Sequence, residues 1–458
     1  MTQLQSACLR ASYSRTIANL FTSPQPDPAL FELSNEVGSL SPILNANLVP
    51  GRRIELTATH GGSSFNLYAG RIKSFSTRPV LGEKTTVIEA LTDVDRLNRT
   101  LLSTGIFAAI NAASLFTEIM SRSGVQSFTA ETLNDSVDFA WYSDRSATGA
   151  VDQLMRSGYY QMYVDGAGTF NLKGRYFGVF SSVVDSLSDG LLDLNYALTD
   201  AQIINSARVQ ATPRKQQTDI STLAFLAQVM VIPASGFASF FTAYLDPRDG
   251  LTPTPVGSAI TPVASQDYYA AANSDGTGTD HTATLSLVFT GFGGSAVSSL
   301  FNGVGNDVHL TRFQVRGYPI LSGAPITTKK EDSTSQTKYG VADFVLEDSL
   351  ITNQNYLRDL VATLITERKD PRDALNLTLR NEFPQVVQYQ VGDVLAVVNS
   401  ITGVNSSWSI RNMQHEISLA AGLEHTVTLA LERFVAKPYL VLDDAVLGKL
   451  DSGRELAF

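Results

Sequence analysis

The sequence predicts a mainly β protein with a minor helical share, divided into several domains. Most of the 458-residue chain alternates apolar and polar residues with period two, between Gly, Pro, Asn and Asp. Segments with helical periodicity are few, and one β-rich segment recurs after about 340 residues. The chain is also too long for one ordinary domain.

The strand pattern is clearest in residues 53–57, 282–287 and 308–313. Three helices are expected from apolar spacing and capping residues. Ser114 is expected to cap a helix that ends at Gly124, Ser146 or Thr148 one that ends at Gly158, and Asn353 one that stops before Asp370 and Pro371.

The internal repeat relates residues 50–91 to residues 391–431, each written as strand, loop, strand, turn, strand. It predicts one β module used twice, with the shared residues on the same face of the same strand. The matched pairs are Gly51/Gly392, Tyr68/Trp408, Arg71/Arg411, Gly82/Gly422, Thr86/Thr426, Val87/Val427, Ala90/Ala430 and Leu91/Leu431.

Two dissimilar blocks separate the copies. The expected division is 1–97 for the first module, 98–200 for a small α+β domain, 201–217 with 331–434 for the second module, 218–330 for an inserted β-sandwich, and 435–458 for a docking arm. The insert has few Lys, Arg or Glu residues between Thr218 and Thr311, so we expect a peripheral contact domain, with a domain that braces the second module as the alternative.

Composition excludes several classes of function. Hydrophobic residues (43%) suffice for several cores, and 44 acidic against 34 basic residues give a net charge of −10, which argues against binding of nucleic-acid phosphates. Cys8 is the single cysteine, so an intrachain disulfide or a thiolate zinc cage is excluded. The most apolar window, 223–244, is interrupted by Gln228, Pro233 and Gly236, so no membrane span is expected.

The histidines offer no clear metal site. They are His60, His281, His309, His415 and His425. His415 and His425 could face each other across the last hairpin, but Glu416 and Glu424 point the opposite way and no third ligand follows. We therefore favour two half-buried strand histidines. Residues 273–280, with Asp275 and Asp280, loosely resemble a calcium loop without its closing Glu, and ordinary turns are favoured.

No catalytic constellation is recognisable, so we expect no enzyme, no cofactor and no catalytic, cofactor-binding or metal residues. Gly-x-Ser-x-Gly and phosphate-loop motifs are absent from the sequence, and the glycines at 291–294 and 303–305 lack a strand-to-helix context. Carboxylate pairs such as Asp93/Asp95 and Asp443/Asp444 are expected by chance. The 16 tyrosines and the Ser/Thr-rich strands would suit carbohydrate recognition, although aromatic residues on sheets are more often core.

Many weak motifs together resemble one family. Residues 41–44, 48–56, 68–72, 91–97, 276–280, 311–319, 339–340, 370–372, 391–394, 410–431 and 448–451 are similar to the tail-tip or baseplate hub proteins of tailed bacteriophages. The resemblance covers nearly the whole chain. Its one departure is that no lysin or long fibre-binding region follows Phe434, which argues against cell-wall cleavage.

The resemblance implies that both modules are tube-type β-barrels and that the protein is a homotrimer forming a pseudo-six-fold ring under the tail tube. It implies a structural virion protein, a minor tail protein at the tail tip assembled in the host cytoplasm, which closes the tube and opens for DNA ejection. Implied partners are a distal tail protein or tail-tube ring, the tape measure protein and tip or fibre proteins, with DNA passing through an acidic lumen without specific binding. The alternative is a carbohydrate-binding protein or a tail-associated hydrolase at the tail tip.

Overall fold

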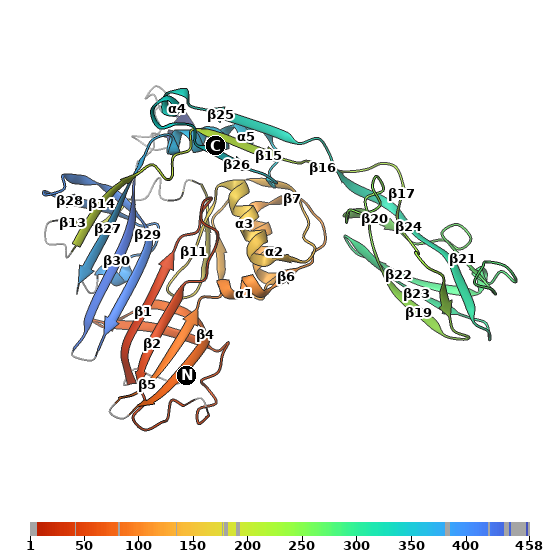
Figure 1. Cartoon of the computed structure of the whole chain (residues 1–458), viewed down its shortest axis with the longest axis horizontal. Helices are drawn as coiled ribbons and strands as arrows, with labels where there is room; N and C mark the ends of the chain where they lie inside the picture. Colours follow the sequence, from red (N-terminus) through yellow and green to blue (C-terminus); the bar gives the residue numbers. More distant parts are fainter. Residues whose placement is uncertain are drawn as a thin grey trace.

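A computed structural model describes residues 7–41, 43–80, 83–133, 135–175, 177, 182–188, 193–380, 385–419, 422–434, 439–440 and 455–456. The fold is mainly β with a minor helical share, as the sequence predicts. Figure 1 shows a large sheet on one side, a compact helical unit beside it, and a β-sandwich that projects away from both. No helix in these described ranges is long and apolar enough to cross a membrane.

The large sheet joins both ends of the chain. Its 11 strands follow the order β14-β27-β30-β29-β1-β2-β5-β4-β3, with β28 paired to β29 and β13 paired to β28. They are β1 (Cys8–Thr16), β2 (Pro28–Ser34), β3 (Arg53–His60), β4 (Ser63–Val80), β5 (Glu83–Leu91), β13 (Val183–Leu187), β14 (Asp193–Thr199), β27 (Arg372–Arg380), β28 (Val394–Asn399), β29 (Val404–Ser418) and β30 (Glu424–Arg433).

Period-two alternation explains why one face of this sheet is buried. In β1, Ala11, Tyr13 and Arg15 are buried while their neighbours are not, and β30 alternates in the same way. One core lies under β1 to β5 around Tyr68 and Ile88. A second lies under β27 to β30 around Trp408 and Leu429. The two halves therefore have the same strand order, β1-β2-β5-β4-β3 and β14-β27-β30-β29-β28, each over its own core.

Strand pairing relates the two halves differently from the sequence identities. Gly51 and Gly392, both at positive φ, donate their N–H groups to the carbonyls of Ile72 and Ile410, each at 2.7 Å. The residue after each isoleucine is bulged out of the ladder, and Ile72 pairs with Ala90 whereas Ile410 pairs with Leu431. Residues at the same place in the two folds, which we call architectural equivalents, therefore differ by one residue from the sequence matches in the last strand. Ala90 is equivalent to Leu431 in the fold, although it matches Ala430 in the sequence.

This shift contradicts the expectation that matched residues share a face. A one-residue slip in a strand moves every side chain to the opposite face. Thr86 and Ala90 are accordingly buried, whereas Thr426 and Ala430 are half-buried on the other face. Of the matched pairs, Gly82 lies outside the described residues.

The helical unit packs around a single core centred on Phe116, Leu154 and Phe170. Its elements are α1 (Val94–Arg99), β6 (Leu101–Leu102), β7 (Phe107–Asn111), α2 (Ala112–Arg122), β8 (Phe128–Ala130), β9 (Ser136–Ala140), β10 (Arg145–Ser146), α3 (Ala147–Gly158), β11 (Gln161–Val164) and β12 (Phe170–Lys173). Ser146 caps α3 as predicted. The predicted cap Ser114 is wrong, because Asn111 accepts the N–H of Ala113 and starts α2 earlier.

Two predicted boundaries also change. The division expected from the sequence places residues 183–199 in the α+β domain, but β13 pairs with β28 and β14 with β27, so both strands belong to the large sheet. The insert was extended to residue 330, but β25 (Ile326–Glu331) pairs with β15 (Ser206–Ala211), which also pairs with β26 (Asp343–Leu346). This small sheet packs on α5 (Gln354–Arg368), which Asn353 caps as predicted. The remaining helices are α4 (Ser333–Tyr339) and α6 (Gln385–Gln388).

The insert consists of two facing sheets. The first contains β16 (Arg214–Gln216), β17 (Ser221–Phe225), β18 (Met230–Ile232), β20 (Val256–Ile260), β21 (Tyr268–Ala271) and β24 (Val308–Ser322); the second contains β19 (Phe237–Ala243), β22 (Leu285–Gly291) and β23 (Ser295–Asn302). The strand expected from residue 282 begins only at Leu285. Thr282–Thr284 form a 3-10 turn, η2, because Asp280 accepts the N–H of Thr282 and the carbonyl of His281 accepts that of Thr284.

Near the C-terminus, β31 (Tyr439–Leu440) pairs with β32 (Glu455–Leu456). Most of the predicted docking arm, including Asp443 and Asp444, lies outside the described residues.

Candidate assembly interface

The two halves of the large sheet meet at a seam between β1 and β29. Seven antiparallel pairs run from Arg10 opposite Ser418 to Thr16 opposite Asn412. At its centre Tyr13 lies opposite His415, and their rings stack with centroids 4.4 Å apart. His415 Nδ1 lies 3.1 Å from His425 Nε2, so one ring donates a hydrogen bond to the other. The seam thus joins the two cores through aromatic rings.

Burial favours the neutral form of both histidines in this pair. Burial lowers the pKa of His415 well below its ordinary value, and Arg15 and His425 lower it further. Burial also lowers the pKa of His425. Within the described ranges no group of three His, Cys, Asp or Glu side chains is arranged to hold a metal ion. The two histidines face each other across the hairpin, as the sequence suggests, but both are buried rather than half-buried.

Arg15 and Asp27 extend the polar contacts along the seam. Arg15 is 1% exposed and donates to Gln390 Oε1 at 2.6 Å and to the carbonyl of Tyr389 at 3.2 Å. Burial raises the pKa of Asp27 to about 7, although a hydrogen bond from Thr16 and the nearby charge of Arg15 oppose the rise. No local sequence pattern marks either residue, because the groups that surround them come from other parts of the chain.

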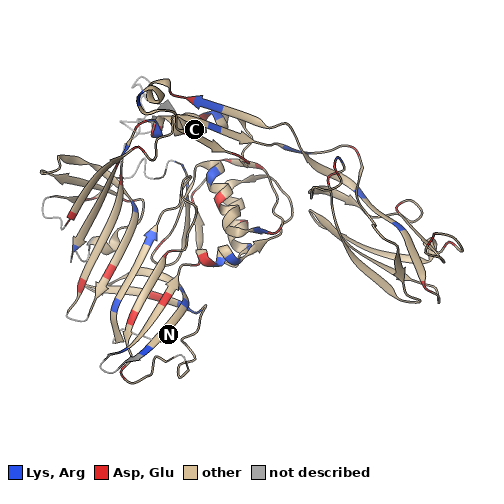
Figure 2. Ribbon diagram, in the orientation of Figure 1, with Lys and Arg blue, Asp and Glu red and all other residues tan. Residues whose placement is uncertain are grey.

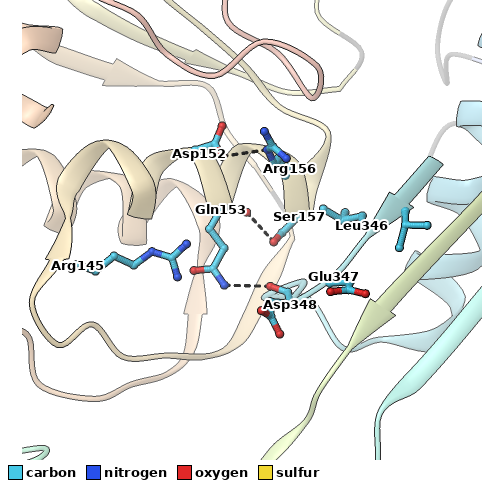
Figure 3. A pocket seen from close by; sticks show the side chains of 9 residues that line it. Arg145, Asp152, Gln153, Arg156, Ser157, Leu346, Glu347 and Asp348 are labelled. Carbon is cyan, nitrogen blue, oxygen red and sulfur yellow. Dashed lines mark hydrogen bonds and ion pairs between the residues drawn. The ribbon is translucent and has the colours of Figure 1, made fainter. Parts of the chain in front are cut away.

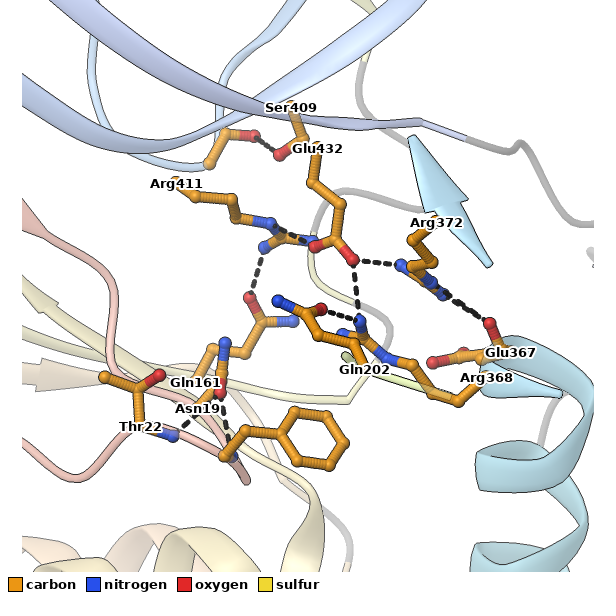
Figure 4. Close-up of polar contacts among 12 residues, drawn as sticks. Asn19, Thr22, Gln161, Gln202, Glu367, Arg368, Arg372, Ser409, Arg411 and Glu432 are labelled. Carbon is orange, nitrogen blue, oxygen red and sulfur yellow. Dashed lines mark hydrogen bonds and ion pairs between the residues drawn. The ribbon is translucent and has the colours of Figure 1, made fainter. Parts of the chain in front are cut away.

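A second polar cluster surrounds Glu432 (Figure 4). Its carboxylate accepts from Arg411 at 2.9 Å, Arg368 at 2.9 Å and Arg372. Burial alone would raise the pKa of Glu432, but the three guanidinium groups outweigh it and lower the pKa to about 2.

The arginines of this cluster also bind neighbouring parts of the chain. Arg411 donates to Gln161 of the helical unit at 3.0 Å, and Arg368 donates to Gln202 at 2.6 Å. The guanidinium of Arg368 lies 4.8 Å from the ring centre of Phe21. The cluster therefore fixes α5, β27, β29 and the helical unit relative to one another.

Two strand edges of the large sheet mirror the seam and have no partner strand among the described residues: β14, and the part of β4 that extends beyond its pairing with β3. Pairing across the sheet places β14 where β1 stands in the other half, and β4 where β29 stands. Tyr13 pairs with Ala29, which in turn pairs with Ala90 on the next strand. Tyr196 pairs with Leu375, which in turn pairs with Leu431, the counterpart of Ala90. Tyr196 is thus the counterpart of Tyr13. Tyr13 is 2% exposed beneath β29, whereas Tyr196 is 43% exposed because no strand lies beside it in the described chain.

Opposite the cores, one polar face runs across the large sheet. Arg10 pairs with Glu416 at 3.5 Å and Arg380 with Glu424 at 3.0 Å, so several of its charges are neutralised. Figure 2 shows acidic and basic residues interspersed on these strands. The face includes Arg10, Ser12, Ser14, Glu32, Ser74, Ser76, Arg78, Glu89, Asn195, Asn376, Thr378, Arg380, Asn412, Gln414, Glu416, Glu424, Thr426 and Thr428.

The other residues singled out by the sequence are held in local structure. Asp275 accepts from Thr277 and Asp280 from Thr282, so both close turns within the insert. Asp93 forms an ion pair with Arg71 at 2.6 Å and Asp95 one with Arg99 at 2.7 Å. The glycines at 291–294 form the β22–β23 turn, and a Cβ on Gly294 would approach Trp141 of the helical unit to 2.6 Å. These glycines therefore allow the insert to contact that unit.

A polar cavity of about 390 Å³ lies between α3 and the end of β26 (Figure 3). Asp152 and Arg156 form an ion pair at 2.9 Å, and Gln153 donates to the carbonyl of Asp348 at 3.0 Å. Ser157 donates to the carbonyl of Gln153 and accepts the N–H of Leu350. The serine hydroxyl is engaged on both sides, so the cavity offers no activated nucleophile.

This architecture is similar to that of solved tail proteins. A tail protein from Neisseria meningitidis MC58 aligns over 93% of this chain and 92% of its own, with 9% identity and a TM-score of 0.51. The chain has the fold of a tail protein. The predicted resemblance is therefore confirmed at the level of fold.

Other tail proteins align with lower scores. The 43 kDa tail protein of prophage MuSo2 from Shewanella oneidensis gives 10% identity, 93% and 94% coverage and a TM-score of 0.49. Prophage tail protein gp18 from Listeria monocytogenes gives 9% identity, 91% and 87% coverage and a TM-score of 0.40. The sequence matches no family model, and no curated protein is detectably similar to it.

Proposed function

We propose that this chain is the structural hub of a phage-type tail tip, in which three copies form a ring that closes the tail tube. The observation that carries the proposal is the exposed counterpart of the β1–β29 seam. Each chain holds one completed seam and, at β14 and β4, the two halves of a second one. Open strand edges of this kind invite pairing with another chain.

The internal seam fixes the register expected between chains. Tyr13 pairs with His415, and the architectural equivalents of these residues are Tyr196 and Thr77. Tyr196 of one copy should therefore lie opposite Thr77 of the next, with Leu198 opposite Phe75 and Ala197 opposite Ser76. Leu198 is 60% exposed in the single chain, and Phe75 would cover it. The new seam would bury side chains that the lone chain leaves in water.

A ring of three such chains contains six modules, which fits a six-fold tube above and a three-fold tip below. We propose the polar face as the lining of the lumen, because the other face of the sheet is covered by the two cores. Its acidic and basic residues are nearly balanced, so the net charge of −10 is not concentrated there. Paired charges and hydroxyl groups would let DNA slide during ejection rather than bind.

The tail-protein fold supports a place in the virion tail, with a distal tail protein or tube ring, the tape measure protein and tip or fibre proteins as partners. We propose no enzymatic activity for the chain. The ring would act by closing the tube and then opening it.

Disulfide trapping tests the register directly. In a Cys8→Ser background, Ala197→Cys with Ser76→Cys should give a covalent trimer on a denaturing gel, because directly opposed Cβ atoms lie about 4.5–5.5 Å apart. The matched control is Ala197→Cys with Arg78→Cys, which is two residues out of register on the same face. Equal trapping by both pairs, or a monomer by light scattering, would overturn the proposal.

A further inference from the structure

The outer face of the second sheet of the insert is unusually apolar for a surface in water. Its inner face packs into the core of the sandwich. On the outer face Phe237 is 70% exposed, Phe241 68% and Val288 67%. Phe301 and Val297 lie between them at 46% and 38%. Contiguous exposed apolar residues mark a binding surface, whereas single ones do not.

Strand register arranges this face in rows. Phe237, Phe301 and Ser286 form one row, and Phe241, Val297 and Thr290 form another. Between them lies the row of Ser239, Ser299 and Val288, in which the two serine hydroxyls are 2.6 Å apart. Ala243 and Ser295 complete the face, which carries no charged side chain. A charged ligand would lose hydration here without gaining an ionic partner.

The layout argues against a stable protein partner. Three strands of seven or eight residues make the face only about 10 by 23 Å across, so a stable protein partner would need further contacts beyond it. Protein interfaces place apolar residues at the centre and polar ones at the rim. Here the hydroxyl pair of Ser239 and Ser299 lies at the centre, and the phenyl rings lie in the rows on either side of it, which is the reverse.

We propose that this face binds a neutral oligosaccharide. Phe237 and Phe241 lie four residues apart on β19, so their rings stand about 14 Å apart, with the hydroxyl of Ser239 between them. Apolar faces of sugar rings stack on the two phenyl groups, and the serine and threonine hydroxyls exchange hydrogen bonds with sugar hydroxyls. Figure 1 places this sheet on the projecting sandwich, away from the large sheet. Each face binds weakly, and several faces in one assembly act together.

The test uses the full chain and a panel of maltohexaose, cellohexaose, mannohexaose and chitohexaose, with a hyaluronan hexasaccharide as the acidic comparison. At least one neutral hexasaccharide should bind at low-millimolar concentration or better. Phe237→Ala with Phe241→Ala should weaken that binding about tenfold or more. The matched control is Phe225→Ala, a phenylalanine 69% exposed on β17 of the other sheet, which should leave binding unchanged.

Oxidative footprinting of the phenyl rings provides a second measurement that does not depend on the variants. The bound hexasaccharide should protect Phe237 and Phe241 but not Phe225. Failure of every neutral hexasaccharide to bind, equal loss in the Phe225→Ala control, or protection of the face by another protein in assembled tails without sugar would each overturn the proposal.

Discussion

Glu432 shows how much one carboxylate contributes when it joins distant segments. Its pKa is lowered to about 2, so the folded state holds it ionised at a pH where the unfolded chain is protonated. Stability from this residue is therefore present above about pH 4.5 and is lost as the pH falls toward 2. Glu432→Gln should lower the free energy of unfolding by about 3 kcal/mol at pH 7, because three arginines lose the carboxylate that they share.

Thermal unfolding at pH 7 and pH 3 measures this cost. The matched control is Glu424→Gln, whose side chain is 56% exposed and pairs with Arg380. It should cost under about 1 kcal/mol. A similar loss in both variants would contradict the account of the Glu432 cluster.

Asp27 makes the stability of the fold change with pH in the opposite direction. Its pKa is raised to about 7, so its contribution is complete below about pH 4 and is lost as the pH rises toward and through 7. Asp27→Asn removes the ionisation and keeps an oxygen that can accept from Thr16. We expect the variant to melt at a higher temperature than the wild type at pH 8, with a gain of up to about 4 kcal/mol, and nearly equally at pH 4. A variant that is less stable at both pH values would contradict this expectation.

His415 adds a second pH dependence of stability in the same seam. Its pKa is lowered, so stability is present above the ordinary histidine pKa of about 6.5 and is lost as the pH falls below it. An Asp27→Asn background removes the raised carboxyl pKa of Asp27 from the comparison. His415→Phe keeps a ring against Tyr13, and it should reduce the fall in melting temperature between about pH 7.5 and 5.5. An unchanged fall would show that another group is responsible.

Buried contacts between segments that are distant in the sequence could not be predicted. Arg15 and Gln390, or Gln161 and Arg411, look like ordinary surface residues until the strands that carry them are paired. His415 and His425 were placed correctly because a short hairpin alone sets their spacing. Local signals thus predict local pairs, while contacts across the sheet depend on topology.

At the scale of elements, the β22–β23 turn offers a direct test of how the insert is held. Gly294 leaves no room for a side chain against Trp141. Gly294→Val should displace the indole and shift its fluorescence to longer wavelength, since the chain's other tryptophan, Trp408, is buried in a separate core. Gly305→Ala meets nothing within 4 Å and should leave the spectrum unchanged. A spectrum that Gly294→Val leaves unaltered would show that the turn does not hold the insert.

Elements themselves were largely predictable, and their registers were not. Period-two alternation located most strands, and Ser146 and Asn353 marked two helix starts. Asn111 was missed because the alanines after it carry no apolar periodicity. The repeat misled in one respect: identities such as Ala90/Ala430 lie on opposite faces, because the strand ladder is set by bulges and glycine turns rather than by matched letters.

For the whole molecule, the insert should be dispensable for folding. The chain enters and leaves it at one place, where Gly323 donates to the carbonyl of Pro213 at 2.8 Å. Replacing residues 214–322 with a short glycine linker should leave the large sheet intact and the oligomeric state unchanged by light scattering. The shortened chain should lose oligosaccharide binding. A chain that no longer folds would identify the insert as a brace for the ring.

The position of β1 has a consequence for synthesis on the ribosome. This strand is synthesised about 400 residues before its partner β29. At roughly 5–20 residues per second, the edge of β1 waits on the order of 20 to 80 seconds before the seam can close. Nascent chains on crowded polysomes therefore expose the same edge together, and the closing of each seam depends on translation running to the last hairpin.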